Sequence, residues 1–217
     1  PSGRTRGFSR EGPLLKALIL VDLQNDFCPG GALAVKGGDQ VIPVANELQK
    51  KFDLVFATQD WHPRDHGSFA SNHPGKKPGD KIDLLGIEQI LWPDHCVQGS
   101  KGAELHPRLD KSRIARVIHK GIDPMIDSYS TFFDNGHKRS TGLENYLKKK
   151  SVDEVYLAGL ATDYCVKYSA LDAVKLGFKT NVILDACRGI DLKSGDVDRA
   201  VEEMKAAGAR MILSKDL

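Results

Sequence analysis

The chain contains no hydrophobic run long enough to cross a membrane. None of its apolar segments approaches the roughly 18 residues that a membrane-spanning helix requires. The apolar segment at 18–21 is also too short and wrongly flanked to act as a secretion signal. We therefore expect a cytoplasmic protein that has no membrane partner.

An excess of charge of one sign is also absent. The 31 Lys and Arg residues nearly balance the 29 Asp and Glu residues, which leaves a net charge of +2 with neutral histidines. Because nucleic-acid binding usually requires a strong basic excess, this balance gives no reason to propose nucleic acid as a partner. No heptad pattern or apolar stripe identifies an oligomer interface, so a homo-oligomer stays an open alternative.

Cysteine is scarce, and one common glycine motif is missing. The four cysteines, Cys28, Cys96, Cys165 and Cys187, could form two disulfides, but a chain of this length without a secretion signal is expected to keep them reduced. No Gly-x-Gly-x-x-Gly sequence follows the first apolar run. A dinucleotide-binding module therefore has little support.

A regular alternation of strand-like and helix-like segments is present instead. Short apolar runs predict six strands, at 14–21, 54–58, 113–120, 155–158, 179–185 and 210–213. Helices are predicted at 39–51, 140–150 and 196–207, and a further helix is predicted between Thr162, as its N-cap, and Gly177, where it stops. This order predicts a three-layer α/β/α fold with a six-stranded parallel sheet, in a single domain over residues 14–217. Residues 61–95 are expected to form a long structured loop excursion, and residues 1–13 a disordered extension.

Four chemically active side chains follow strands of the predicted sheet. Asp22, Asp60 and Lys120 come at or just after strand ends, and Cys165 lies in the first turn of a helix with Thr162 as its N-cap. Because ligands bind beyond the carboxyl ends of parallel strands, one crevice could gather all four. A thiol, a carboxylate and an ammonium together suit nucleophilic catalysis. Taken singly, each has a plainer interpretation as a turn cap, a surface lysine or a buried helical thiol.

A second set of residues has the composition of a metal site. Asp60 and His62 are two positions apart, so in an extended segment both side chains point the same way. One carboxylate and two imidazoles suit zinc, iron(II) or manganese in an open site. Spacing does not identify the third ligand, since His66, His73 and His95 all lie in the same excursion. A lone histidine in such a loop is more often a surface residue.

Six motifs occur in order along the chain. They are Asp-Leu-Gln-Asn-Asp-Phe at 22–27, Gln-Asp-Trp-His-Pro at 59–63, His-Gly-Ser-Phe-Ala at 66–70, Trp-Pro-Asp-His-Cys-Val at 92–97, His-Lys-Gly at 119–121 and Gly-Leu-Ala-Thr-Asp-Tyr-Cys-Val at 159–166. Through them the chain resembles the nicotinamidases (pyrazinamidases) of the isochorismatase-like cysteine hydrolase superfamily. The resemblance runs from about residue 15 to the C-terminus, and the insert at 74–91 lies outside every motif.

The resemblance implies a role for each matching residue. The family's catalytic positions correspond to Asp22, Lys120 and Cys165. Its metal ligands correspond to Asp60, His62 and His95, with Ser68 reaching the metal through water. The oxyanion hole corresponds to the backbone N–H groups of Ala161 and Cys165. The substrate-binding positions correspond to Phe27, Leu33, Trp92, Leu160, Ala161 and Tyr164, and the family has a cis peptide bond at the position of Leu160 and Ala161.

The resemblance also implies an activity and a cofactor. We expect an amidohydrolase that converts nicotinamide to nicotinate and ammonia through a thioester on Cys165, accepts pyrazinamide and serves NAD salvage. One divalent metal ion is expected, zinc first, with iron or manganese as alternatives.

Three other functions stay open at this point. Isochorismate, or a carbamoyl or ureido amide, would suit the same fold with other pocket walls, although the metal set favours a substrate with a ring nitrogen. A non-catalytic metal- or nucleotide-binding module and a hydrolase that uses metal-activated water are alternatives of other classes. Alkylation of the thiol and chelation of the metal, run side by side, separate a thiol-dependent from a metal-dependent reaction.

Overall fold

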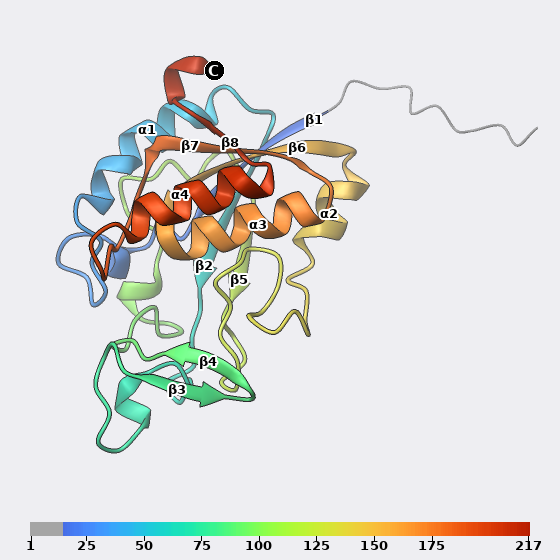
Figure 1. Ribbon diagram of the computed structural model, residues 1–217. Helices are drawn as coiled ribbons and strands as arrows, with labels where there is room; N and C mark the ends of the chain where they lie inside the picture. The colour runs from blue at the N-terminus through green and yellow to red at the C-terminus, as the bar shows by residue number, and fades with distance from the viewer. Residues whose placement is uncertain (1–14) are drawn as a thin grey trace, which may run out of the picture.

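The computed structural model describes residues 15–217, and the extension predicted over residues 1–13 lies outside the described residues. Its central feature is a six-stranded sheet in which every neighbouring pair of strands is parallel (Figure 1). The sheet contains, in spatial order, β5 (Ile114–Lys120), β2 (Leu54–Asp60), β1 (Leu15–Val21), β6 (Val152–Leu160), β7 (Lys179–Arg188) and β8 (Arg210–Ile212). The predicted number and direction of the strands are confirmed.

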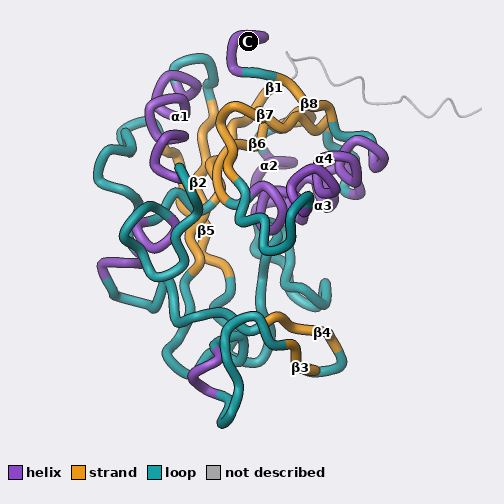
Figure 2. The backbone as a smooth tube through the Cα atoms, turned by 60° about the vertical axis from the view of Figure 1, so that its left-hand side comes forward, coloured by secondary structure: helices purple, strands orange, loops and turns teal. Residues whose placement is uncertain are grey.

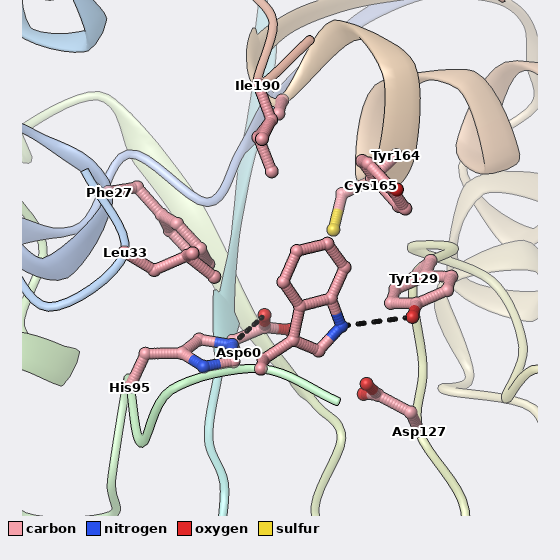
Figure 3. A pocket seen from close by; sticks show the side chains of 11 residues that line it. Phe27, Leu33, Asp60, His95, Asp127, Tyr129, Tyr164, Cys165 and Ile190 are labelled. Atoms are coloured by element: carbon pink, nitrogen blue, oxygen red, sulfur yellow. Dashed lines mark hydrogen bonds and ion pairs between the residues drawn. The ribbon is translucent and has the colours of Figure 1, made fainter. Parts of the chain in front are cut away.

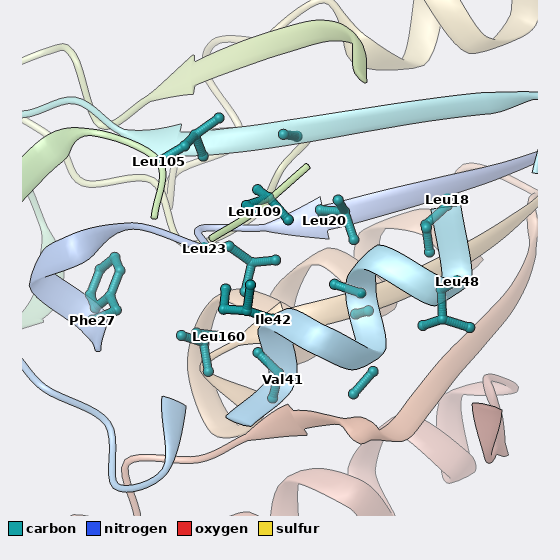
Figure 4. Close-up of a cluster of buried hydrophobic side chains, with 14 of the residues drawn as sticks. Leu18, Leu20, Leu23, Phe27, Val41, Ile42, Leu48, Leu105, Leu109 and Leu160 are labelled. Atoms are coloured by element: carbon teal, nitrogen blue, oxygen red, sulfur yellow. The ribbon is translucent and has the colours of Figure 1, made fainter. Parts of the chain in front are cut away.

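Helices cover both faces of the sheet. One face carries α1 (Val41–Gln49), and the other carries α2 (Leu143–Lys149), α3 (Lys167–Lys175) and α4 (Asp196–Ala207) (Figures 1 and 2). Side chains alternate along β1, so that Leu18 and Leu20 pack under α1 (Figure 4) while Ile19 packs on the opposite face. In residues 15–217 no helix has the length and apolar character to span a bilayer. The predicted three-layer α/β/α arrangement is confirmed.

The long excursion contains a hairpin that the sequence analysis did not predict. β3 (Lys81–Leu84) and β4 (Ile87–Ile90) pair antiparallel and are joined by Leu85 and Gly86. Both turn residues have positive φ, 55° and 80°, as in the tight turns that match the twist of a hairpin. The hairpin lies beyond the carboxyl ends of β2 and β5 (Figure 1), which is where the sheet is expected to bind a ligand.

Gly159 is required where β6 passes β1. Its φ is +132°, and a Cβ at this position would collide with the backbone carbonyl oxygen of Val21 in β1. We expect Gly159→Ala to lower the free energy of unfolding by about 3 kcal/mol or more, because backbone strain adds to an overlap that cannot relax. Urea unfolding measures this loss.

Gly177→Ala is the matched control for this prediction. Gly177 also has a positive φ, +87°, but no atom lies within 4 Å of the added Cβ. Only the left-handed strain remains, so a loss of about 1 kcal/mol is expected. Equal losses for the two variants would contradict the role given to the collision with Val21.

Candidate active site

The strand register brings the predicted residues to one edge of the sheet. Lys120 is the last residue of β5 and pairs with Asp60, the last residue of β2. Asp22 directly follows Val21, the last residue of β1. Cys165 follows β6 by a short turn. Because β5, β2, β1 and β6 are consecutive neighbours in the sheet, these four side chains start from adjacent strand ends.

The Lys120 ammonium lies at the centre of this cluster. Its Nζ is 2.5 Å from Asp60 Oδ1 and 2.8 Å from Asp22 Oδ2. It also donates hydrogen bonds to Cys165 Sγ at 3.3 Å and to the Ser128 carbonyl oxygen at 3.1 Å. Burial by itself would lower the pKa of Lys120, but the charges of Asp22 and Asp60 more than offset it and raise the pKa well above its usual value. Lys120 is therefore an ammonium ion that holds two carboxylates and a sulfur around one point.

Asp22 is held in place by Thr58. The Thr58 hydroxyl donates to Asp22 Oδ1 at 2.6 Å, and the Asp22 backbone N–H donates back to Thr58 Oγ1 at 3.1 Å. Burial raises the pKa of Asp22 above its ordinary value, although the Lys120 charge opposes the rise. A carboxylate with a raised pKa accepts a proton from a thiol more readily than an ordinary aspartate does.

The turn that carries Cys165 differs from the predicted helix start. Residues Thr162–Val166 form a π-helical turn, closed by a hydrogen bond of 3.1 Å from the Val166 N–H to the Ala161 carbonyl oxygen, and α3 begins only after it. The prediction that Thr162 is the N-cap is wrong, because Ala161 occupies that position and no side chain caps the turn. Single π-turns of this kind are frequent at functional sites.

The Cys165 sulfur points into a pocket (Figure 3). It lies within 4.8 Å of a carboxylate oxygen of Asp22 and of Asp60. Burial raises the pKa of the Cys165 thiol well above its usual value, although the Lys120 charge opposes the rise. The resting group is therefore a thiol, and it needs a neighbouring base before it can act as a nucleophile.

Asp60, His62 and His95 have the geometry of a metal-binding set. Their ligand atoms lie within 4.8 Å of one another, and Asp60 Oδ2 is 3.5 Å from His62 Nε2 and 3.7 Å from His95 Nε2. Backbone carbonyl oxygens fix the other ring nitrogens, at 2.8 Å for His62 Nδ1 and 2.7 Å for His95 Nδ1. Among residues 15–217, the buried His62 Nε2 has no hydrogen-bond partner. An unpartnered imidazole nitrogen beside a carboxylate fits a divalent cation, because metal-bound histidines are oriented in this way.

Ser68 and His66 lie next to this set. Ser68 Oγ is 2.7 Å from His66 Nδ1, and the His66 ring lies against His62 with centroids 4.3 Å apart. Burial lowers the pKa of His66 to about 4, so its ring is neutral. His73 bonds instead to the Gly67 carbonyl oxygen at 2.7 Å. Coordination by the Asp60 set and the water-mediated contact of Ser68 stay predictions.

The pocket beside Cys165 has largely the predicted walls. Its volume is about 330 Å³ when the open solvent at its mouth is included. Five of the predicted wall residues line it: Phe27, Leu33, Trp92, Ala161 and Tyr164. The prediction for Leu160 is corrected, because its side chain is fully buried in the apolar cluster under α1 (Figure 4). The peptide bond between Leu160 and Ala161 is cis.

The sequence analysis missed three residues that line the pocket, namely Asp127, Tyr129 and Ile190. The Tyr129 hydroxyl accepts hydrogen bonds from Trp92 Nε1 at 3.1 Å and from Gln89 Nε2 at 3.0 Å. Gln89 belongs to β4, so the unpredicted hairpin helps to hold a pocket wall. All three residues lie outside the regular elements or at their ends, where no periodicity marks them. Proximity in sequence to Lys120 was the one available signal for Asp127 and Tyr129.

The fold and the side chains at its carboxyl edge define an isochorismatase-like hydrolase. The family described as Isochorismatase domain matches residues 16–216, and the chain belongs to this family. The nicotinamidase of Escherichia coli (strain K12) is 53% identical over 205 residues, which cover 93% of this chain and 96% of the relative.

Two solved structures extend the comparison. A nicotinamidase and pyrazinamidase of Acinetobacter baumanii superposes with a TM-score of 0.91 at 50% identity, over 94% of this chain and 98% of that one. A pyrazinamidase of Pyrococcus horikoshii, solved in complex with zinc, has a TM-score of 0.75 at 40% identity, over 91% and 98% of the two chains.

Proposed function

We propose that the chain hydrolyses nicotinamide to nicotinate and ammonia through a thioester on Cys165. The observation that carries this proposal is the contact of one ammonium, Lys120, with the Cys165 sulfur and with the carboxylates of Asp22 and Asp60. This cluster places a nucleophile (Cys165), a base for its proton (Asp22) and a positive charge (Lys120) beside a pocket with aromatic walls. The choice of substrate is supported by the Escherichia coli relative, which is a nicotinamidase.

The first half of the reaction forms the thioester. Asp22 takes the thiol proton while the Cys165 sulfur bonds to the amide carbon, and the carbonyl electron pair moves to oxygen. The backbone N–H groups of Ala161 and Cys165 stabilise this oxyanion, and each such donor is worth about 10²- to 10³-fold in rate. The protonated Asp22 then delivers its proton to the amide nitrogen, the C–N bond breaks, and ammonia leaves.

The second half of the reaction returns the free thiol. Asp22 accepts a proton from a water molecule as the water oxygen bonds to the thioester carbon. The C–S bond then breaks to give nicotinic acid, the sulfur regains a proton from Asp22, and the acid loses its remaining proton to solvent as nicotinate. One carboxyl group thus serves twice in each half. Lys120 keeps it oriented and compensates the negative charge that passes between Asp22 and Cys165.

One divalent cation is proposed at Asp60, His62 and His95, with Ser68 reaching it through water. Zinc is the first choice because the Pyrococcus horikoshii relative was solved with it, and iron or manganese are the alternatives. When bound, the cation supplies a Lewis acid that anchors the ring nitrogen of the substrate. The carbonyl groups behind His62 and His95 keep both rings turned toward this position.

Replacing His95 with alanine is expected to empty this site. Loss of one of three protein ligands should reduce bound metal from about one ion per chain to a small fraction and raise the KM for nicotinamide. Elemental analysis of the purified protein measures the metal directly. His73→Ala removes the same kind of side chain at a residue whose ring bonds to the Gly67 carbonyl oxygen, and it should retain the metal. Equal metal content in the two variants would remove His95 from the ligand set.

The proposed activity is tested by incubating the protein with nicotinamide and measuring both ammonia and nicotinate. Benzamide, which lacks a ring nitrogen, is expected to react much more slowly, and isochorismate is not expected to react. Iodoacetamide should abolish ammonia release. A protein that is inhibited by chelator but indifferent to alkylation would favour metal-activated water instead.

The remaining parts of the proposal follow from the same relatives. Pyrazinamide is proposed as a second substrate, and NAD salvage as the use of the nicotinate formed. We also propose a cytoplasmic location and a single domain over residues 14–217. A homo-oligomer is compatible with this proposal, because every proposed catalytic group comes from one chain.

A further inference from the structure

Asp127 is a buried carboxylate in the pocket for which the proposed reaction has no use. It lies in the loop between β5 and α2, and its exposed fraction is 3%. Figure 3 shows its carboxylate beside Tyr129, turned toward the pocket. Its Oδ1 accepts a hydrogen bond from the Ser128 N–H at 2.8 Å, whereas Oδ2 accepts from Gln89 Nε2 at 3.5 Å. One Asp127 oxygen also lies within 4.8 Å of ring nitrogens of His62 and His66. One oxygen of Asp127 is therefore only weakly satisfied by the protein.

The charges around the pocket make this carboxylate important for a ligand. Among the described residues, the pocket lining includes the carboxylates of Asp60 and Asp127 and neither lysine nor arginine. Lys120, which contacts Cys165, is already bonded to Asp22 and Asp60, and the cation proposed at Asp60 would offset the charge of that carboxylate. Asp127 is the lining carboxylate that the proposed reaction leaves without a partner of opposite charge. A ligand that fills so small a pocket lies within a few ångströms of Asp127, and charges at that distance in a poorly hydrated site interact strongly.

We propose that Asp127 is a specificity-determining residue that makes the pocket favour neutral carboxamides over carboxylates. The inference rests on the proposed function, in which the substrate is a neutral amide and the product a carboxylate anion. Repulsion by Asp127 weakens product binding and hastens product release. The same repulsion disfavours anionic substrates such as isochorismate, for which the family fold would otherwise be suitable.

The test compares the binding of nicotinamide and nicotinate in a chain that cannot turn them over. Cys165→Ala, with its metal content measured, serves as the parent for isothermal titration calorimetry with each compound. Asp127→Asn is then added, because asparagine keeps the oxygen that accepts from Ser128 and removes the charge, although it replaces the other oxygen with an amide donor. The Kd for nicotinate is expected to fall about tenfold or more, while the Kd for nicotinamide changes by less than about threefold.

Two further variants separate local charge from other causes. Asp127→Ala removes the charge without adding an amide donor, and it should also strengthen nicotinate binding relative to nicotinamide. Asp123→Asn makes the same charge change on the same loop, at a residue paired with Arg139 outside the pocket lining, and should alter neither affinity. A uniform change in both affinities, or an equal gain from Asp123→Asn, would overturn the proposal, since neither reflects repulsion inside the pocket.

The binding measurements, taken together with the activity of the unmodified chain, show whether the role of Asp127 or the proposed function has failed. If the Cys165→Ala parent binds both compounds but the unmodified chain releases no ammonia, the catalytic proposal fails while the binding ratio still tests Asp127. If the parent binds neither compound, both proposals are overturned. If nicotinate affinity is unchanged in Asp127→Asn while the unmodified chain is active, the inference alone fails.

Discussion

Cys165→Ala is expected to lower the rate of ammonia release from nicotinamide by at least about 10⁴-fold while the protein stays folded. The proposed reaction has no other nucleophile within reach of the pocket, because Cys165 is the one cysteine among its described lining residues. Removal of the sulfur leaves only the oxyanion donors and the binding pocket, which support a small residual rate. Ammonia assays over long incubations measure the fall, and circular dichroism reports the fold.

Cys187→Ala is the matched control for the nucleophile. Cys187 is another buried free thiol, packed in the same apolar cluster as Cys165, and it does not line the pocket. Its replacement should leave ammonia release within a few-fold of the unmodified chain. A Cys165→Ala variant that keeps substantial activity would rule out the covalent route, whatever the control shows.

Lys120→Met is expected to have the second largest effect, on both activity and stability. Without the ammonium, Asp22 loses the charge that opposes the effect of its burial, so its pKa rises further and the carboxyl group takes up a proton. Loss of a buried partner of this kind costs about 3 to 5 kcal/mol in the free energy of unfolding. Loss of an ionised Asp22 removes the base and should lower kcat by about 10²- to 10⁴-fold.

Two comparisons make the Lys120 prediction specific. Lys76→Met applies the same substitution at an exposed lysine and should change neither urea unfolding nor kcat. Lys120→Met combined with Asp60→Asn removes one of the two buried carboxylates, so part of the lost stability should return without a return of activity. If Lys120→Met turned over nicotinamide at nearly the normal rate, the ammonium would not be needed to keep Asp22 ionised.

The sheet could be predicted from the sequence because its strands have a strong local pattern. The apolar runs that became β1 and β2 are bounded by polar or glycine residues, and both faces of the sheet are covered, as continuous apolar runs imply. The hairpin of β3 and β4 was not predicted, because its strands are short, half exposed and set in a segment rich in proline and glycine. Its signal was the weak alternation of residues 81–90 around the turn at Leu85 and Gly86.

The candidate site could be predicted where its residues follow strand ends. Asp22, Asp60 and Lys120 were identified in this way, since parallel strands deliver their carboxyl ends to one edge. The residue pattern does not predict a π-helical turn. Thr162 was therefore wrongly predicted to be a helix N-cap, whereas Ala161 holds that position before the turn. The error for Leu160 had a similar cause, because a residue can adjoin the pocket in sequence while its side chain points into the core.

The pocket residues that lie in loops were the least predictable part of the site. Asp127 and Tyr129 reach the pocket through a loop whose path depends on hydrogen bonds to distant residues, such as the one between Tyr129 and Gln89 of the hairpin. No spacing rule connects residues that lie 40 positions apart, one in a short hairpin strand and the other in an irregular loop. The position of Asp127 in the pocket wall therefore depends on tertiary contacts that the sequence pattern does not show.

The measurement that tests the account most directly is mass spectrometry of the protein quenched in acid during turnover of nicotinamide. The account predicts a nicotinoyl group on the peptide that contains Cys165, absent without substrate and lost when turnover is allowed to finish. Ammonia release at a normal rate with no acylated peptide at any quench time, or with the acyl group on another residue, would contradict the assignment of Cys165 as the nucleophile.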